Sequence, residues 1–271
     1  MQINPYIFRN YDIRARVPDE IDTAKVEAIG KSYGTFLRRR KIRQAVVGYD
    51  CRLSGPEFHA AYINGLTSTG VDVVDIGMCM TQMVYWSQYY FQTNGATMIT
   101  ASHNPKDFNG FKIATAFSQT TLPRDIKEIR EAVEKDKYFV AEKKGAVTEV
   151  DIHGAYQKDI LKRVDIKKKL KVLVDFRHGT PAFFIPEILR AAGCDVIAKN
   201  DTVDGSFPKG TPDPTDEDYM RGLGEEVKKG NFDVAFCYDG DGDRIGLVDE
   251  KGRIMWNDMM LAIFAGEILE R

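Results

Sequence analysis

The sequence predicts an α/β protein built as two tandem three-layer α/β domains, each with a mostly parallel mixed sheet. Short β-branched apolar runs alternate with longer amphipathic stretches, which is the pattern of parallel strands joined by crossover helices. This alternation is interrupted once, in a polar segment around 140–150, and then starts again. The length of 271 residues exceeds the usual size of one domain, so two domains are expected.

In the first half, apolar spacing predicts three strands and three helices. The helix at 23–40 rests on apolar side chains that recur at three- and four-residue steps: Val26, Ile29, Tyr33, Phe36 and Leu37. The other expected elements are strands at 45–50, 71–77 and 95–100 and helices at 56–70 and 123–135. The poorly periodic sequence AEKKGAVTEVD then predicts a linker around 140–150.

The second half repeats this order. Strands are expected at 170–176, 194–200 and 232–239, and helices at 181–193 and 216–230. Pro186 is expected to kink its helix or to delay its start. The segment 245–255 resembles a hairpin with its turn at Glu250 to Gly252. Asn257 is a plausible cap for an apolar-rich final helix.

Composition and charge exclude several classes of partner. The chain is 43% hydrophobic and 29% charged, with a net charge of −2, so neither nucleic acid nor an anionic membrane is an expected partner. The charged amino end and the lack of an apolar run of about 18 residues predict a cytoplasmic protein. The four cysteines form no C-x-x-C pair, so reduced, half-buried thiols are expected: Cys51, Cys79, Cys194 and Cys237.

The stretch TASHNPKDFNGFK at 100–112 is the first candidate site. Ser102 follows a predicted strand on a loop, where we expect it to be exposed to attack, and His103 beside it is a candidate base. Asn104-Pro105 stops the chain from continuing as a helix. The G-x-S-x-G elbow is missing, so acyl transfer fits poorly. The alternative is a loop serine that bonds its own backbone.

The stretch DGDGDR follows a predicted buried strand. Asp239, Asp241 and Asp243 alternate with glycines and can fold inward together, where their repulsion is costly unless a cation lies among them. A divalent metal site is therefore predicted. An EF-hand is the rival interpretation, with Glu250 at its twelfth place, but Arg244 occupies the sixth place, where that loop needs glycine. A hydrated surface turn is the remaining alternative.

Two further stretches are weak signals when taken alone. They are FRNYDIR, which carries Tyr11 and Arg14, and GYDCRLSG, which carries Arg52. Taken together, a serine loop, an acidic loop and arginines fit phosphoryl transfer, which needs an acceptor oxygen, a cation and guanidinium groups that hold phosphate. The same parts also allow a metal-dependent aspartyl phosphatase with Asp239 as the nucleophile.

The three motifs together resemble those of the α-D-phosphohexomutase family, most closely its bacterial phosphomannomutase/phosphoglucomutase branch. TASHNPKDFNGFK is similar to the phosphoserine loop of that family, DGDGDR to its metal loop and FRNYDIR to its amino-terminal motif, while VDGSFPKGTPDPT is similar to a proline-rich connection in its second domain. The resemblance implies domain 1 over 1–145, domain 2 over 146–253 and a truncated start of domain 3 over 254–271.

The resemblance also implies roles for individual residues. Ser102 would carry the phosphoryl group, and Mg²⁺ would be held by that phosphoserine together with the three aspartates of DGDGDR. Lys112 and His103 would lie near the transferring proton, with Lys112 the better general acid or base. The implied substrate-binding residues are Tyr11, Arg14 and Arg244.

The implied reaction is reversible transfer of phosphate between C1 and C6 of a mannose or glucose phosphate, through a hexose 1,6-bisphosphate. Two departures from the family pattern stand out: Ala15 replaces a glycine, and VDFRHGT replaces a turn rich in glycine and asparagine. The sugar-binding and phosphate-clamping domains of the family do not follow, so these missing domains are expected partners and the chain is expected to be inactive alone. A non-catalytic binding module that kept the motifs is the alternative.

Overall fold

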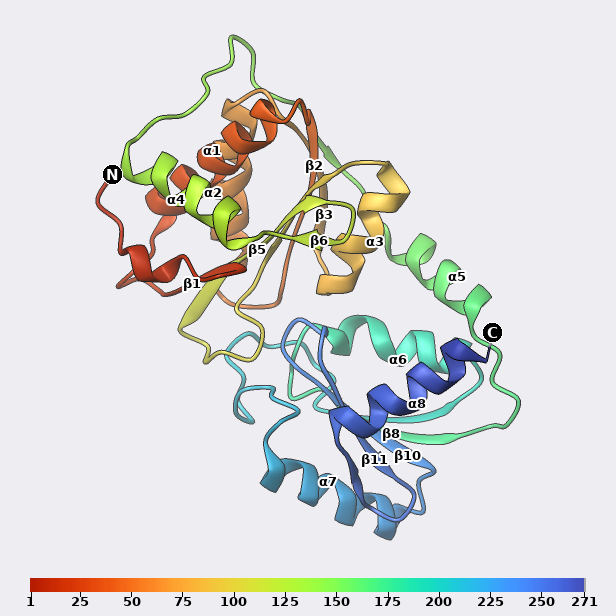
Figure 1. Ribbon diagram of the computed structural model, residues 1–271. Helices are drawn as coiled ribbons and strands as arrows, with labels where there is room; N and C mark the ends of the chain where they lie inside the picture. The colour runs from red at the N-terminus through yellow and green to blue at the C-terminus, as the bar shows by residue number, and fades with distance from the viewer. Residues whose placement is uncertain (271) are drawn as a thin grey trace. The chain divides into compact units, whose positions relative to one another are not determined.

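The computed structural model describes residues 1–270 and divides into two compact units, Met1–Tyr156 and the remainder from Gln157 (Figure 1). The sequence placed this division at 145/146. Each unit is a mixed sheet with helices packed on it, so the predicted tandem α/β architecture is confirmed. None of the helices within 1–270 is long and apolar enough to cross a bilayer.

The first unit is built on a seven-stranded sheet in the order β1-β5-β4-β2-β3-β7, with β6 beside β5. The strands β4, β2, β3 and β7 run parallel, whereas β5 is antiparallel to both β4 and β1. Their bounds are β1 (Asp12–Arg16), β2 (Gln44–Tyr49), β3 (Asp72–Met78), β4 (Gly95–Ile99), β5 (Phe108–Ala116), β6 (Gln119–Thr120) and β7 (Val147–Glu149).

The helices of this unit form layers on the two faces of its sheet. The crossover from β2 to β3 and the crossover from β3 back to β4 run in opposite directions, so right-handed connections place α2 and α3 on opposite faces. Helix α1 packs against both α2 and α4, and the five residues that predicted α1 are all buried. The helices are η1 (Pro5–Ile7), α1 (Thr23–Arg39), α2 (Gly55–Ser68), α3 (Thr81–Phe91), α4 (Pro123–Glu134) and α5 (His153–Arg163), which crosses the unit boundary.

Helices α1 and α2 approach each other through a glycine on each. A Cβ at Gly65 would lie 2.1 Å from Glu27 O, and one at Gly30 would lie 2.4 Å from Tyr62 O. Gly65→Ala is therefore expected to lower the free energy of unfolding by about 1 to 3 kcal/mol, because the helices must separate. Chemical denaturation measures this loss. The control is Gly154→Ala, where a Cβ meets nothing within 4 Å and stability should hold; an equal loss in both variants would contradict the packing argument.

The second unit is built on a five-stranded sheet in the order β12-β11-β10-β8-β9, of which β10, β8 and β9 run parallel. Helix α7 packs on β10 and β11, and α6 packs on β9. The strands are β8 (Lys171–Asp175), β9 (Asp195–Lys199), β10 (Val234–Tyr238), β11 (Ile245–Asp249) and β12 (Ile254–Met255), and the helices are α6 (Pro181–Ala191), α7 (Glu217–Gly230) and α8 (Asn257–Leu269).

Three local predictions are corrected by the structure. The predicted linker contains β7, which pairs with β3 and extends the first sheet. Of the two outcomes expected for Pro186, the delayed helix start is wrong, because α6 begins at Pro181 and contains Pro186. Trp256, not Asn257, is the residue preceding α8, and its side chain makes no capping hydrogen bond.

The hairpin turn predicted at Glu250 to Gly252 is confirmed. Gly252 has φ 72°, a value that favours glycine. The Asp249 carboxylate accepts from the amide of Lys251, within the turn, and from the amide of Arg253, just beyond it. The turn therefore closes on a side chain from the end of β11.

Candidate active site

The serine loop lies at the point where the first sheet reverses its strand order. The chain leaves β2 toward β3 and then crosses back over β2 to β4, so the loops that follow the adjacent strands β2 and β4 lead away in different directions. Ligands of open α/β sheets bind at such switch points, outside the carboxyl ends of the strands. The two loops here are 50–54, which carries Arg52, and 100–107, which carries Ser102.

The acidic loop occupies the equivalent place in the second sheet. Strands β8 and β10 are adjacent, and the chain visits β9 between them. The loops after β8 and β10 meet directly, because the amide of Thr180 donates to Gly240 O over 3.0 Å. The two strongest motifs of the sequence thus each lie at the switch point of their own sheet.

Ser102 adopts a left-handed backbone conformation with φ 55°. That conformation is costly for a non-glycine residue, and here it is fixed by a 2.8 Å hydrogen bond from the Ser102 amide to Thr100 Oγ1. Ser102 is fully buried, so the expected exposure of this serine is wrong. The loop turns inward because its main chain is hydrogen-bonded to side chains beneath it.

The structure brings His103 and Arg14 beside Ser102. His103 Nδ1 lies 3.4 Å from Ser102 Oγ, longer than an ordinary hydrogen bond. The buried Arg14 donates from Nη1 to Ala101 O over 2.6 Å and also to the Asn104 side chain. Its Nε is paired with Asp12 Oδ2 at 2.7 Å. A buried guanidinium therefore holds both sides of the serine loop.

Lys112 shares a face of the sheet with Arg14. In the β1–β5 register Lys112 lies opposite Asp12 and Gly110 lies opposite Arg14, and residues directly opposite project from the same face. A Cβ on Gly110 would lie only 1.9 Å from Ile13 O, so glycine is needed for this approach. The Tyr11 side chain is exposed.

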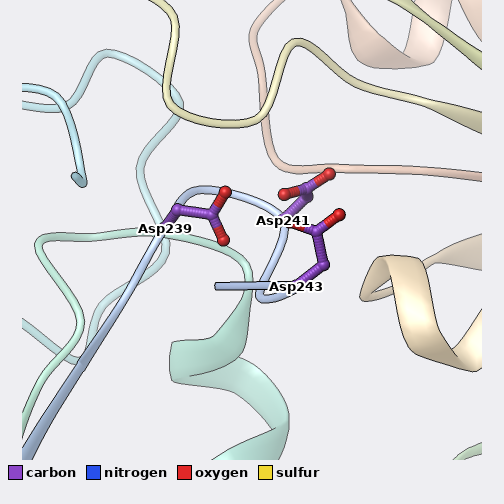
Figure 2. A group of neighbouring side chains, drawn as sticks. All are labelled: Asp239, Asp241 and Asp243. Atoms are coloured by element: carbon purple, nitrogen blue, oxygen red, sulfur yellow. The ribbon is translucent and has the colours of Figure 1, made fainter. Parts of the chain in front are cut away.

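The acidic loop gathers the three predicted metal ligands. One carboxylate oxygen from each of Asp239, Asp241 and Asp243 lies within 4.8 Å of the others. Figure 2 shows the three side chains gathered at this loop. Asp239 and Asp241 are fully buried, and Asp243 is exposed. Buried carboxylates this close repel one another strongly, and carboxylate oxygens suit a hard cation such as Mg²⁺. These residues therefore fit a magnesium ion.

The loop is closed by hydrogen bonds between Asp239 and Arg244. Asp239 Oδ1 accepts from the Arg244 amide over 3.0 Å, and the Asp239 amide donates to Arg244 O over 3.2 Å. Arg244 directly follows Asp243 in the chain, and its side chain is exposed. The EF-hand interpretation is wrong, since the loop joins the antiparallel strands β10 and β11 and Glu250 lies in the next turn.

Both departures from the family pattern are accommodated by the backbone. Ala15 lies inside β1, opposite Asn109, where an alanine causes no strain. Arg177 and His178 have φ of 42° and 66°, values that favour glycine. Arg177 Nη1 donates to Thr211 O over 3.0 Å, and its guanidinium lies 3.8 Å from the centre of the Tyr219 ring. These contacts hold the turn beside the acidic loop without glycine at positions 177 and 178.

The surroundings of the acidic loop are strongly desolvated. Burial raises the pKa of the Cys237 thiol, on β10, to about 12, so this thiol stays protonated and unreactive near neutral pH. Burial also raises the pKa of Tyr219 above its ordinary value, partly offset by Arg177. Only Cys51 is half-buried as expected; Cys79, Cys194 and Cys237 are buried.

Arg52, a weak signal in the sequence, is built into the support of the serine loop. Arg52 and Asp50 are both fully buried and form an ion pair, Nε to Oδ2, at 3.2 Å. Asp50 Oδ2 also accepts from the Thr100 hydroxyl over 2.7 Å, the same hydroxyl that receives the Ser102 amide. The signal in the sequence was the charged pair in GYDCR, which directly follows an apolar strand.

Comparisons with known proteins identify both units. The family model described as phosphoglucomutase/phosphomannomutase, alpha/beta/alpha domain I, matches residues 5–139, and the model for domain II of the same proteins matches residues 154–252. The two matches contain the serine loop and the acidic loop, respectively.

Individual relatives are longer than this chain. A phosphomannomutase/phosphoglucomutase of Pseudomonas aeruginosa is 38% identical over 98% of the chain and 57% of its own length, and a phosphoglucomutase of Neisseria gonorrhoeae is 35% identical over the same shares. The crystal structure of a Burkholderia thailandensis phosphoglucomutase/phosphomannomutase family protein matches with a TM-score of 0.94 and 30% identity, covering 100% of this chain and 60% of that one. The chain thus spans under two thirds of these relatives.

Proposed function

Since this chain belongs to the phosphoglucomutase/phosphomannomutase family, we propose that it carries a phosphoryl group on Ser102 and exchanges it with a hexose phosphate in the presence of Mg²⁺. The observation that supports this proposal is the placement of the serine loop and the acidic loop, each at the switch point of its own sheet. In the longer protein, the complete reaction would be reversible transfer between C1 and C6 of a glucose or mannose phosphate.

The proposed roles of the residues follow from their positions. Ser102 Oγ is the acceptor. Lys112, on the sheet face that also carries Arg14, is the proposed general acid or base, and His103 assists beside the hydroxyl. Arg14 holds the loop and places positive charge next to the phosphoryl group. Because Ser102 is buried, transfer requires an opening movement that exposes its hydroxyl.

Further contacts to substrate are proposed for Arg244 and Tyr11, which are both exposed. Asp239, Asp241 and Asp243 would hold the magnesium ion, and a phosphate oxygen on Ser102 is proposed as a further ligand. When bound, Mg²⁺ supplies positive charge that neutralises the phosphoryl oxygens during transfer. The hexose monophosphate and the 1,6-bisphosphate are the proposed substrates, and the carboxyl-terminal domains found in longer relatives are proposed partners in turnover.

Intact-mass measurement after incubation with glucose 1,6-bisphosphate and Mg²⁺ tests this proposal. The wild-type chain should gain one phosphoryl group, mapped to Ser102 by peptide analysis, and Ser102→Ala should gain none. Chelation of Mg²⁺ should prevent the gain. An unchanged mass of the wild type, despite binding of the bisphosphate, would contradict phosphoryl transfer and favour a non-catalytic binding module.

Phosphate release, measured in the same incubation, separates the serine route from an aspartyl phosphatase. That enzyme would place the phosphoryl group on Asp239, so Ser102→Ala would still release phosphate and Asp239→Asn would not. Asp239 already accepts a hydrogen bond from the Arg244 amide and lies among the metal ligands. This arrangement suits a ligand better than a nucleophile, and phosphate release by Ser102→Ala would reverse that conclusion.

A further inference from the structure

The side chain of Arg52 connects the loop after β2 to the whole length of the serine loop. A guanidinium has five N–H donors in a fixed planar arrangement, and the Arg52 group makes five hydrogen bonds. One goes to the Asp50 carboxylate, three go to main-chain carbonyls of the serine loop, and one goes to the carbonyl of Phe108, where β5 begins. The acceptors are Ser102 O (2.8 Å), Asn104 O (2.7 Å), Pro105 O (2.6 Å) and Phe108 O (2.8 Å).

These contacts stabilise a backbone conformation of the serine loop that would be unfavourable without them. Ser102 is held in the left-handed region, which a non-glycine residue leaves unless its surroundings prevent it. The Ser102 carbonyl is bonded to Arg52, and the Ser102 amide is bonded to Thr100, whose hydroxyl is held by Asp50. Both ends of the serine residue are thus tied to one buried ion pair.

We propose that Arg52 is a positioning residue, which holds the serine loop in the conformation that aims Ser102 Oγ for phosphoryl transfer. Arg52 acts through four carbonyls, touches no substrate in this role and needs no change of protonation. This inference rests on the proposed function of Ser102. A misplacement of about 1 Å in a reacting group can cost about 100-fold in rate. Loss of the hydrogen bonds from Arg52 should therefore lower the rate of phosphoryl transfer.

Arg52→Lys is the variant that separates position from charge. Lysine keeps the positive charge opposite Asp50, but its three donors on a flexible stem cannot reproduce a planar five-donor arrangement. The matched control is Arg38→Lys: Arg38 is half-buried in the same unit, and its Nη1 approaches the main-chain Gly70 O at 3.5 Å, away from the serine loop.

Two measurements are made on each protein: amide hydrogen exchange, read residue by residue, and the rate of phosphorylation of Ser102 by glucose 1,6-bisphosphate. In Arg52→Lys, exchange at the amides of Ser102 and Asn104 should rise at least about 10-fold, with exchange in α1 unchanged, and the phosphorylation rate should fall about 100-fold. Arg38→Lys should match the wild type in both measurements.

The outcomes distinguish this inference from the proposed function. If the wild type is not phosphorylated, the function fails, while the exchange data still show whether Arg52 fixes the loop. Wild-type exchange at the loop in Arg52→Lys would overturn the inference. An exchange increase spread evenly over the first unit would also overturn it, because Arg52 would then contribute only general stability. Faster loop exchange with an unchanged phosphorylation rate would overturn the link to transfer.

Discussion

Asp241→Asn is expected to lower the rate of Ser102 phosphorylation about 1,000-fold and, at the same time, to raise the melting temperature of the metal-free second unit. The first effect follows from loss of a metal ligand, because a bound cation contributes several kcal/mol of charge stabilisation and about 1.4 kcal/mol corresponds to tenfold in rate. The second follows from repulsion, since three carboxylates lie within 4.8 Å and two are buried.

The two effects are measured by the time course of intact mass with Mg²⁺ and by thermal melting in a chelator. The control is Asp233→Asn, in the same unit but outside the acidic loop. The Lys171 amide and the Lys168 side chain hold the pKa of Asp233 below its ordinary value. Its charge therefore stabilises the folded unit above the unfolded pKa, and this contribution is lost as the pH falls through the folded pKa.

Asp233→Asn should accordingly lower the melting temperature near neutral pH and leave the phosphorylation rate unchanged. The two variants thus make the same chemical change with effects of opposite sign on stability. An Asp241→Asn protein that transfers phosphate at the wild-type rate would exclude the acidic loop as the metal site. One that melts lower than the wild type without metal would contradict the repulsion among the carboxylates.

The sequence predicted the elements whose signal is local. The helix α1 was readable because one face carries apolar residues at helical spacing, and β10 and the acidic loop were readable because an apolar run ends in alternating aspartates. The strand β7 was missed because its three residues are all exposed, so burial imposes no apolar pattern on them. The strand β1 was missed although DIRAR alternates charged and apolar residues with the spacing of a half-buried strand. Three of its five residues are charged, and the strand lies at the edge of the sheet.

The candidate site was predictable in its chemical groups but not in its supporting contacts. Ser102 and the three aspartates stand in recognisable motifs. The burial of Ser102 and the role of Arg52 depend on the adjacency of β2 and β4, which are separated along the chain by α2, β3 and α3. A single arginine after a strand carries no information about the carbonyls that it will meet, since those belong to a loop about 50 residues later.

Asp50→Ala is expected to lower the free energy of unfolding of the first unit by about 3 to 5 kcal/mol, the usual loss when one partner of a buried ion pair is removed. Asp50 and Arg52 are fully buried, so the arginine would keep its charge without a counter-ion. The Thr100 hydroxyl would also lose its acceptor at 2.7 Å. Chemical denaturation followed by a probe in the first unit measures the loss.

The control for Asp50→Ala is Glu128→Ala. Glu128 pairs with Arg39 and Arg40 at 3.0 and 2.8 Å, distances as short as those at Asp50, but on the surface. Exposed pairs contribute about 1 kcal/mol or less, so the two alanine variants should differ severalfold. Asp50→Asn keeps an oxygen acceptor without the charge and should fall between them. Equal losses at Asp50 and Glu128 would mean that Arg52 is held by the loop carbonyls alone, and that the buried pair does not anchor the serine loop.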